Sequence, residues 1–239
     1  MQYKKSLLQR LLVIYITFFI VLVMSFVHEG LPDFTKGYSD GVEVSNDITE
    51  KWMSGTPRLF YLLQNIPIAN APTTEIPETD STTARTVKAR ITNLTLTVEE
   101  NAPEDMSMLG VGFYSYGGSP WVYSMILLLA LFYLAIIVLM IMIIHSLRRS
   151  IREERTLDRR NVWLLRAIGM LTILNELLGS TAEWMMSNRA AGLLSQSGYT
   201  VDTGFHVSYS IIIMGILILF AAEVFAIGQN LSEEQKLTI

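Results

Sequence analysis

Several ionisable side chains lie inside or beside two long apolar segments in the second half of this 239-residue chain. They are Arg166, Glu176, Glu183, His206 and Glu223. Charge in the hydrocarbon of a bilayer is costly, so an ionisable residue in a membrane helix is either paired or part of a proton, ion or ligand pathway. The chemistry open to this chain therefore depends on the partner of each group.

The two apolar segments are expected to form antiparallel helices joined by a short connection. Residues at equal depth then have a constant sum of residue numbers. Arg166 with Glu223 and Glu183 with His206 share the same sum, and both pairs are chemically complementary. We predict an ion pair near the cytoplasmic face and a polar pair near the outer face. The Arg166–Glu223 pair is either a switchable lock or a structural contact that satisfies two costly charges.

Glu176 has no ionisable partner at its own depth, where Ile213 stands. It belongs to a small and polar seam along its helix, formed by Gly169, Thr172, Glu176, Gly179 and Glu183. Small residues let membrane helices approach closely, and buried polar groups join across such seams. We expect Glu176, beside Asn175, to face the bundle interior. There it is either a proton or cation relay or a neutral carboxylic acid hydrogen-bonded between helices.

Motifs for enzymatic chemistry are absent from the sequence. It has no cysteine, and it contains no Gly-Lys-Ser/Thr phosphate loop, His-Glu-x-x-His zinc helix or Gly-x-Ser-x-Gly elbow. His28, Glu29, Glu183 and His206 are of types that bind zinc, but they come from separate segments without metal-binding spacing. We therefore predict no catalytic residues, no metal site, no cofactor and no enzymatic activity.

The elements that position these residues are membrane helices. Residues Trp121 to Leu147 form an uncharged apolar run, longer than the about 20 residues that cross a bilayer. Arginines follow at once, at Arg148, Arg149, Arg152, Arg155, Arg159 and Arg160. Basic residues next to membrane spans stay in the cytoplasm. These arginines therefore set the topology, and direct contact with nucleic acid is not needed to explain them.

Three further spans are expected. The first is Leu11 to Val27, an uncleaved anchor because bulky residues stand where a signal peptide needs small ones. The third covers Leu164 to Trp184 and the fourth Val207 to Ile227. Ser119-Pro120 is typical of a helix start and begins the second span. The prediction is a multi-pass protein with both termini in the cytoplasm.

The region between spans one and two is polar and acidic. Arg58 to Ile68 is predicted as a strand or short helix, and residues 70–84 as an exposed loop. Apolar residues alternate in residues 87–91 and, in the opposite parity, in 94–98, which predicts a strand pair with a bulge or turn at Thr92-Asn93. We expect a small β-rich extracytoplasmic domain.

The predicted fold class is an all-α membrane protein, a four-helix transmembrane bundle with that β-rich insertion. Its domains are an anchor at 1–28, the extracytoplasmic domain at 29–118, and a three-span membrane domain at 119–239. Only 17% of the residues are charged, against about 25% in globular domains, which indicates lipid-facing surface. The fourth helix is expected to end near Gly228. The short tail after it then frays, docks on a partner, or packs on the arginine loop through Glu233 and Glu234.

The last twenty residues carry Ala-Glu-Val-Phe at 222–225, Gly228, Leu231, Glu-Gln at 234–235 and a final Leu-Thr-Ile. With Leu165-Arg166-x-Ile168-Gly169, they resemble the bacterial membrane proteins of the family called domain of unknown function 2975. The resemblance implies a four-span inner-membrane protein without assigned chemistry, often encoded beside a small helix-turn-helix regulator. Arg166 and Glu223 fall on its two signature segments.

Two functions remain in view. The first is a non-enzymatic sensor or regulatory component in the bacterial cytoplasmic membrane, which acts through a cytoplasmic partner such as that regulator. The alternative is a small transporter or ion-coupled membrane protein that uses Glu176. The lipid bilayer is the one partner that composition requires, and formation of a homo-oligomer is left open. A neighbouring regulator gene favours the first function, and a metabolic or efflux operon favours the second.

Overall fold

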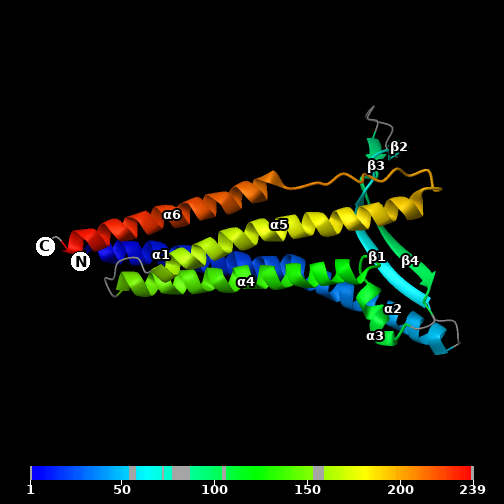
Figure 1. The fold of residues 1–239 in the computed structure, drawn as a ribbon, viewed down its shortest axis with the longest axis horizontal. Coiled ribbons are helices and arrows are strands. Elements are labelled where there is room, and N and C mark those ends of the chain that lie inside the picture. Colours follow the sequence, from blue (N-terminus) through cyan, green and yellow to red (C-terminus); the bar gives the residue numbers. More distant parts are fainter. Residues whose placement is uncertain are drawn as a thin grey trace, which may run out of the picture. The chain divides into compact units, whose positions relative to one another are not determined.

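A computed structural model describes residues 2–53, 58–71, 73–76, 87–103, 106–152 and 159–237. The chain forms two compact units, each built from separate stretches of sequence (Figure 1). Unit 1 comprises residues 1–45, 130–176 and 208–239. Unit 2 comprises residues 46–129 and 177–207. These boundaries differ from the predicted domains, because unit 2 joins one end each of two long helices to the strands.

Among the residues that the structure describes, three helices are long and apolar enough to cross a membrane. They are α4 (Pro120–Arg152), α5 (Arg159–Leu194) and α6 (Tyr209–Leu237), with candidate spans at Pro120–Arg149, Arg159–Leu194 and Tyr209–Gln229. α4 begins at Pro120, as the Ser-Pro start predicts. The 36 residues of α5 measure about 54 Å at the α-helical rise, more than the roughly 30 Å of hydrocarbon. Part of α5 therefore extends beyond a bilayer core.

The expected first span is not shown to be a membrane helix. α1 (Gln2–Ser25) continues through a π-helical turn, η1 (Phe26–Gly30), into α2 (Leu31–Met53). Within this helical stretch, the described apolar part is Ile16–His28. That part is shorter than the about 20 residues that a bilayer requires, so four spans are not established.

The expected β-rich domain begins with a helix. Pro32 is the second residue of α2 and directly follows the π-helical turn η1. Gly37 and Gly41 lie within this helix, and a Cβ at either position would have nothing within 4 Å. Within 29–118, the described strands therefore lie between residues 58 and 101.

The strands pair differently from the prediction. β1 (Arg58–Pro67) pairs antiparallel with β4 (Asn93–Asn101), and β2 (Thr73–Ile76) pairs antiparallel with β3 (Val87–Arg90). The expected pairing of β3 with β4 is wrong, because the change of parity at Thr92 separates two sheets. The irregularity lies in β1, between Leu63 and Ile66, where Asn65 has a φ of 56°. β2 also lies within the stretch predicted as a loop, of which residues 77–84 are outside the described part.

The core of unit 2 forms around β1. Tyr61, Leu63 and Ile66 are almost fully buried, and they belong to one cluster with Val122 of α4 and Met186 of α5. Segments on the other edge also bond to β1: Gly117 donates to the carbonyl of Leu62, and Asp202 to that of Pro67. β1 is therefore held by β4, by the segment before α4 and by the connection before α6. The short helix α3 (Met108–Tyr114) adds Val111 to this core.

Unit 1 is held by apolar contacts between its helices. Ile143 of α4 packs with Leu164 and Ile168 of α5 in a buried cluster, against which Ile218 of α6 also packs. α5 and α6 approach closely at two glycines. A Cβ on Gly169 would lie 2.9 Å from the carbonyl oxygen of Gly215, and one on Gly215 would lie 2.5 Å from Cγ1 of Ile173. Small residues thus set the helix separation, as they do in membranes.

The seam predicted along α5 does not meet a single partner. Gly169 contacts α6, whereas Gly179 has Leu129 of α4 as its nearest neighbour at 3.9 Å. The hydroxyl of Thr172 donates to the carbonyl of Ile168 in its own helix. The outward side chains of the long helices are apolar, as on Ile213 and Phe220 of α6, which are exposed in the isolated chain. Apolar surface of this extent is typical of contact with lipid.

The expected helix end at Gly228 is wrong. α6 continues to Leu237. A separate peptide as short as the segment after Gly228 is marginal as a helix, because nucleation of a helix is costly. Here the segment extends an existing helix, which avoids that step. The side chains of Glu233 and Glu234 lie outside the described residues.

Candidate functional site

Arg166 of α5 and Glu223 of α6 lie in contact within unit 1. Nε of Arg166 donates to Oε1 of Glu223 at 2.8 Å, and NH2 donates to Oε2 at 2.9 Å. This two-bond fork is the strongest geometry open to an arginine and a carboxylate. The two side chains remain 47% and 56% exposed in the isolated chain. The pair therefore lies on the surface of the α5–α6 contact, where lipid or another protein meets it.

The pair lies near one end of both candidate spans. Arg166 is seven residues from Arg159 and Glu223 is six residues from Gln229, which places each about 10 Å from the end of its candidate span. At that depth, long polar side chains reach the polar interface of a bilayer. At this location the contact pairs the two charges. It lies outside the buried core, so separating the two side chains leaves the packing of that core unchanged.

Glu176 is engaged with the start of α6. The backbone N–H of Ser208, which precedes the first residue of α6, donates to Oε1 of Glu176 at 2.6 Å. The expectation that Glu176 lacks a partner at its depth was based on side chains, and a backbone donor was not considered. A carboxylate at a helix amino terminus also interacts favourably with the helix dipole.

Asn175, the neighbour of Glu176, has a buried Oδ1 without a hydrogen-bond partner among the described residues. Both amide atoms of Asn161, near the start of α5, share this property within the described part of the chain. Unsatisfied polar atoms are costly in a protein interior and more so in a membrane. Oδ1 of Asn175 is therefore a buried polar atom that a proton carrier or water could satisfy.

Glu183 and His206 lie at the same cavity of unit 2, but not as an ion pair. His206 has Asp202 as its ionic partner, with Nε2 3.4 Å from Oδ2. Oδ1 of Asp202 accepts the N–H of Gly204 at 2.9 Å, which turns the chain back toward His206. The expected Glu183–His206 pair assumed that residue 206 belongs to a helix. α6 begins only at Tyr209, so the depth rule does not extend to His206.

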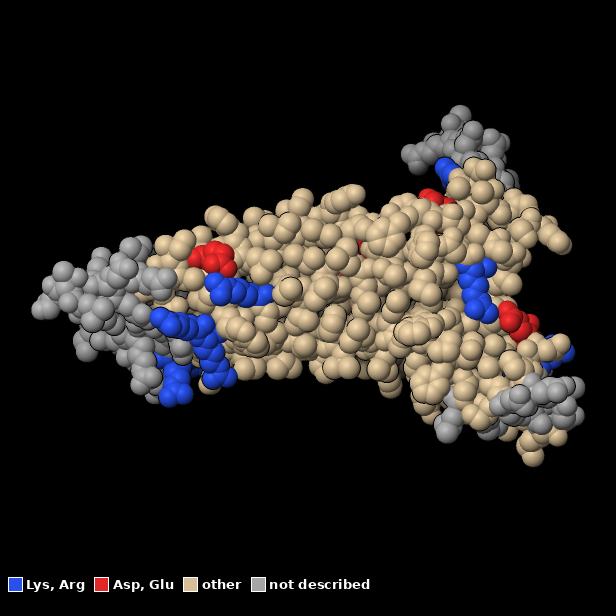
Figure 2. Space-filling model, in the orientation of Figure 1, with Lys and Arg blue, Asp and Glu red and all other residues tan. Residues whose placement is uncertain are grey.

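The topology-setting arginines lie around the junction between α4 and α5. Arg148, Arg149 and Arg152 are in the last turns of α4, and Arg159 and Arg160 begin α5. Arg155 lies outside the described residues. Figure 2 shows Lys and Arg side chains gathered at this end of the helices of unit 1, beside a long uncharged surface. That arrangement suits a polar interface next to a bilayer.

A family model described as "Protein of unknown function (DUF2975)" matches residues 68–239. The chain belongs to the DUF2975 family. No curated protein and no solved structure matches it. The family therefore supplies membership but no activity, substrate or partner.

The DUF2975 match covers all three candidate spans and both signature segments. Arg166, Glu176, Glu183, His206 and Glu223 all fall inside it. The helices α1 and α2 and the whole of β1 precede it. The site residues on α5, α6 and their connection thus belong to the shared part of this DUF2975 protein, whereas Tyr61 and Asn65 do not.

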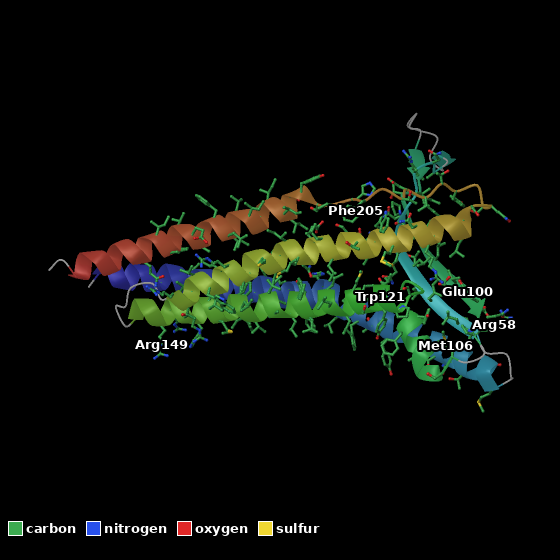
Figure 3. The ribbon with its side chains drawn as sticks, in the orientation of Figure 1. Arg58, Glu100, Met106, Trp121, Arg149 and Phe205 are labelled. Carbon is green, nitrogen blue, oxygen red and sulfur yellow. The ribbon has the colours of Figure 1, made fainter. Side chains whose placement is uncertain are left out.

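A second polar cluster, absent from our sequence predictions, surrounds Arg189 of α5. Its NH1 donates to the carbonyl of Gly118 at 2.5 Å, and its Nε lies 3.3 Å from the hydroxyl of Tyr61. NH2 lies 3.6 Å from Oε1 of Glu100, which also accepts from the hydroxyl of Tyr61. The guanidinium carbon stands 4.6 Å from the centre of the Tyr61 ring. Figure 3 labels Glu100 on β4.

Gly118 allows this cluster to form. It has a φ of 62°, and a Cβ there would lie 2.7 Å from the Tyr61 ring and 2.8 Å from the guanidinium. Burial raises the pKa of the Tyr61 hydroxyl, and its hydrogen bond to Glu100 adds to that effect while Arg189 opposes it. Burial also raises the pKa of Tyr116, with a further contribution from the charge of Glu183. Both phenols therefore stay neutral at ordinary pH.

One sequence signal could have found this cluster. Arg189 is a lone basic residue at the end of the third span where the positive-inside rule expects none. Such a residue needs a local carboxylate, but no spacing indicates which one. The cluster fixes α5 to the sheet and to the segment before α4.

Proposed function

We propose that this DUF2975 protein is a non-enzymatic sensor or regulatory component of the bacterial cytoplasmic membrane. It acts through a cytoplasmic protein bound at the end that carries the arginines, and both chain termini lie on that side. The observation that supports this proposal most is the exposed two-bond contact between Arg166 and Glu223. A surface pair of this kind can exchange one partner for another while the apolar core remains packed.

The continuity of α5 supports the same function. This single helix contributes residues 159–176 to unit 1 and residues 177–194 to unit 2. When a ligand changes the packing around the second half of α5, the uninterrupted helix carries the displacement to Arg166. An α-helix transmits displacement along its axis because every backbone group is hydrogen-bonded within it.

Capture of the partner in cells tests the proposal. The tagged full chain is cross-linked in its native host and the bound cytoplasmic protein is quantified. We expect the double variant Arg166→Ala/Glu223→Ala to change capture several-fold, with an unchanged amount of protein in the membrane. Removing both residues avoids leaving one unpaired charge within a candidate membrane span, which is the more damaging change. The double variant Arg58→Ala/Glu99→Ala removes an exposed pair of unit 2 and serves as the matched control.

Capture that is equal in wild type and both double variants contradicts the regulatory function. A shorter chain that ends at Asn230 provides a second readout of the same surface. If the partner binds it as well as the full chain, the contact does not involve the end of α6.

The alternative function, a small ion-coupled transporter, draws on the unsatisfied Oδ1 of Asn175 beside Glu176. A carboxylate beside an open polar atom within a span is a site where a proton or cation can pause. Flux measured in proteoliposomes separates the two functions. Transport that is lost in Glu176→Gln and retained in Glu183→Gln favours the alternative, whereas unchanged partner capture in Glu176→Gln agrees with the regulatory function.

A further inference from the structure

Unit 2 contains a cavity of about 180 Å³. Three structural elements contribute its walls: the facing ends of β1 and β4, the second half of α5, and the connection before α6. The lining residues are Asn65, Pro67, Asn93, Ser180, Glu183, Trp184, Ser187, Asp202, Gly204 and His206. Phe205, labelled in Figure 3, lies in the connection before α6, between the lining residues Gly204 and His206.

α5 presents one face to the cavity. Ser180, Glu183, Trp184 and Ser187 follow the spacing of three, four and seven residues that aligns side chains on an α-helix. Ser180 and Ser187 are 5% and 4% exposed, so they form the inner wall. Trp184 and Glu183 are more exposed and stand nearer the opening. The wall formed by α5 thus presents hydroxyl groups in the interior of the cavity, and a carboxylate and an indole near its opening.

The opposite wall is fixed in place by backbone geometry. Asn65 adopts its positive φ at the irregularity of β1, and its side-chain oxygen accepts a hydrogen bond from the amide of Asn93 on β4. The connection is held by the hydrogen bond from the N–H of Asp202 to the carbonyl of Pro67, at 2.9 Å. These contacts within the protein hold the wall in one geometry, and such preorganisation lowers the entropic cost of binding.

The charges of the lining favour a cation. Two carboxylates, from Glu183 and Asp202, face one imidazole, that of His206, and the lining includes no lysine or arginine. A concave site with one sign of charge and low-dielectric walls concentrates ions of the opposite sign. Within the described residues, no group of His, Cys, Asp and Glu is arranged to hold a metal ion. The cavity also has the volume of about six waters at roughly 30 Å³ each, more than a bare ion fills.

We propose that this cavity binds a small organic ammonium compound. Glu183 and Asp202 receive the N–H groups of the ammonium, and the indole of Trp184 covers its apolar part and adds a cation–π attraction. The amide and hydroxyl groups of the two walls orient any polar substituent. The inference rests on the proposed function, for which this ligand is the input signal on α5.

Calorimetric titration of the purified full chain in lipid nanodiscs tests the inference. Three probes share one shape and differ in charge: 2-phenylethylammonium, 2-phenylethanol and phenylacetate. We expect saturable binding of the ammonium compound alone. Glu183→Gln and Asp202→Asn should each weaken that binding at least fivefold. Glu99→Gln removes a carboxylate of the same unit outside the cavity and should leave the affinity unchanged.

Equal binding of the alcohol or of phenylacetate, binding that survives both cavity variants, or no saturation of the wild type at probe concentrations on the order of 10 mM overturns the inference. The comparison of the three probes uses the wild type, so it decides the question even if a variant fails to fold. Partner capture is measured separately in cells. Amine binding without any capture contradicts only the regulatory function, and capture without amine binding contradicts only this inference.

Discussion

At the scale of single residues, Arg189 holds unit 2 together through one guanidinium. This guanidinium contacts the backbone carbonyl of Gly118, the carboxylate of Glu100, and both the hydroxyl and the ring of Tyr61. Arginine suits this position because its planar fork offers several donors in fixed directions. Lysine, with a compact ammonium, cannot contact all of these groups.

Replacing Arg189 should destabilise the protein clearly. Arg189→Leu leaves the carboxylate of Glu100 without its cation and the carbonyl of Gly118 without a donor, which costs about 2 kcal/mol of unfolding free energy. We expect the Tm of the purified protein to fall by roughly 5 °C in a thermal scan. Arg58→Leu removes a similarly exposed ion pair with Glu99 and should cost at most about 1 kcal/mol. Equal shifts in the two variants contradict the central role of Arg189.

Tyr61 should make stability fall at high pH. Its pKa in the folded chain is raised above the ordinary 10.0, so folding favours the protonated phenol. That contribution is fully present below pH 10.0 and is lost as the pH rises through the folded pKa. Unfolding midpoints measured from pH 8 to pH 11 should therefore decline above about pH 10. Tyr61→Phe should reduce this decline, and an unchanged decline contradicts the assignment.

At the scale of elements, the contact between α5 and α6 depends on two glycines. Gly169→Ala places a methyl group against the carbonyl of Gly215 and the side chain of Leu219, both at 2.9 Å. The helices must then move apart, at a cost of about 1–3 kcal/mol. We expect a lower unfolding midpoint in a denaturant titration.

Gly228 offers the matched control for this prediction. It lies on α6 with nothing within 4 Å of a Cβ. Gly228→Ala should therefore be neutral or slightly stabilising, since alanine is the better helix former by about 1 kcal/mol. If Gly169→Ala is as stable as Gly228→Ala, α5 and α6 do not pack as the structure describes.

At the scale of the whole molecule, the arginines at the α4–α5 junction predict the orientation in the membrane. We expect a reporter fused at Asn70 to be active outside the cytoplasm and one fused at Asp158 to be active inside it. The reason is that basic residues beside a span resist translocation. Cytoplasmic activity at Asn70 rules out this topology.

A fusion at the carboxyl end completes the topology test. We expect a fusion at the end of α6 to be cytoplasmic, because the chain crosses the membrane twice after a cytoplasmic α4–α5 junction if α5 and α6 both span it. A fusion at the amino end then decides whether α1 crosses the membrane. It reports a cytoplasmic terminus if α1 is a fourth span, as we propose.

The sequence alone was sufficient for the three apolar helices, the start of α4 at Pro120 and membership of the family. These properties are local, because hydropathy, segment length and short motifs can be read directly from the sequence. Equal depth and opposite charge also led to Arg166 and Glu223, because both residues stand within regular helices that run side by side.

The tertiary structure decided the partners that depend on irregular backbone. His206 and Ser208 precede α6, so their contacts with Asp202 and Glu176 follow the path of the connection and not a helical depth rule. The pairing of β4 with β1 is a second example. The alternation of apolar and polar residues in these segments fits pairing with other strands equally well, so it does not select the partner. A hydrogen bond or a cavity wall requires atoms within a few ångströms, and only the folded chain brings distant residues that close.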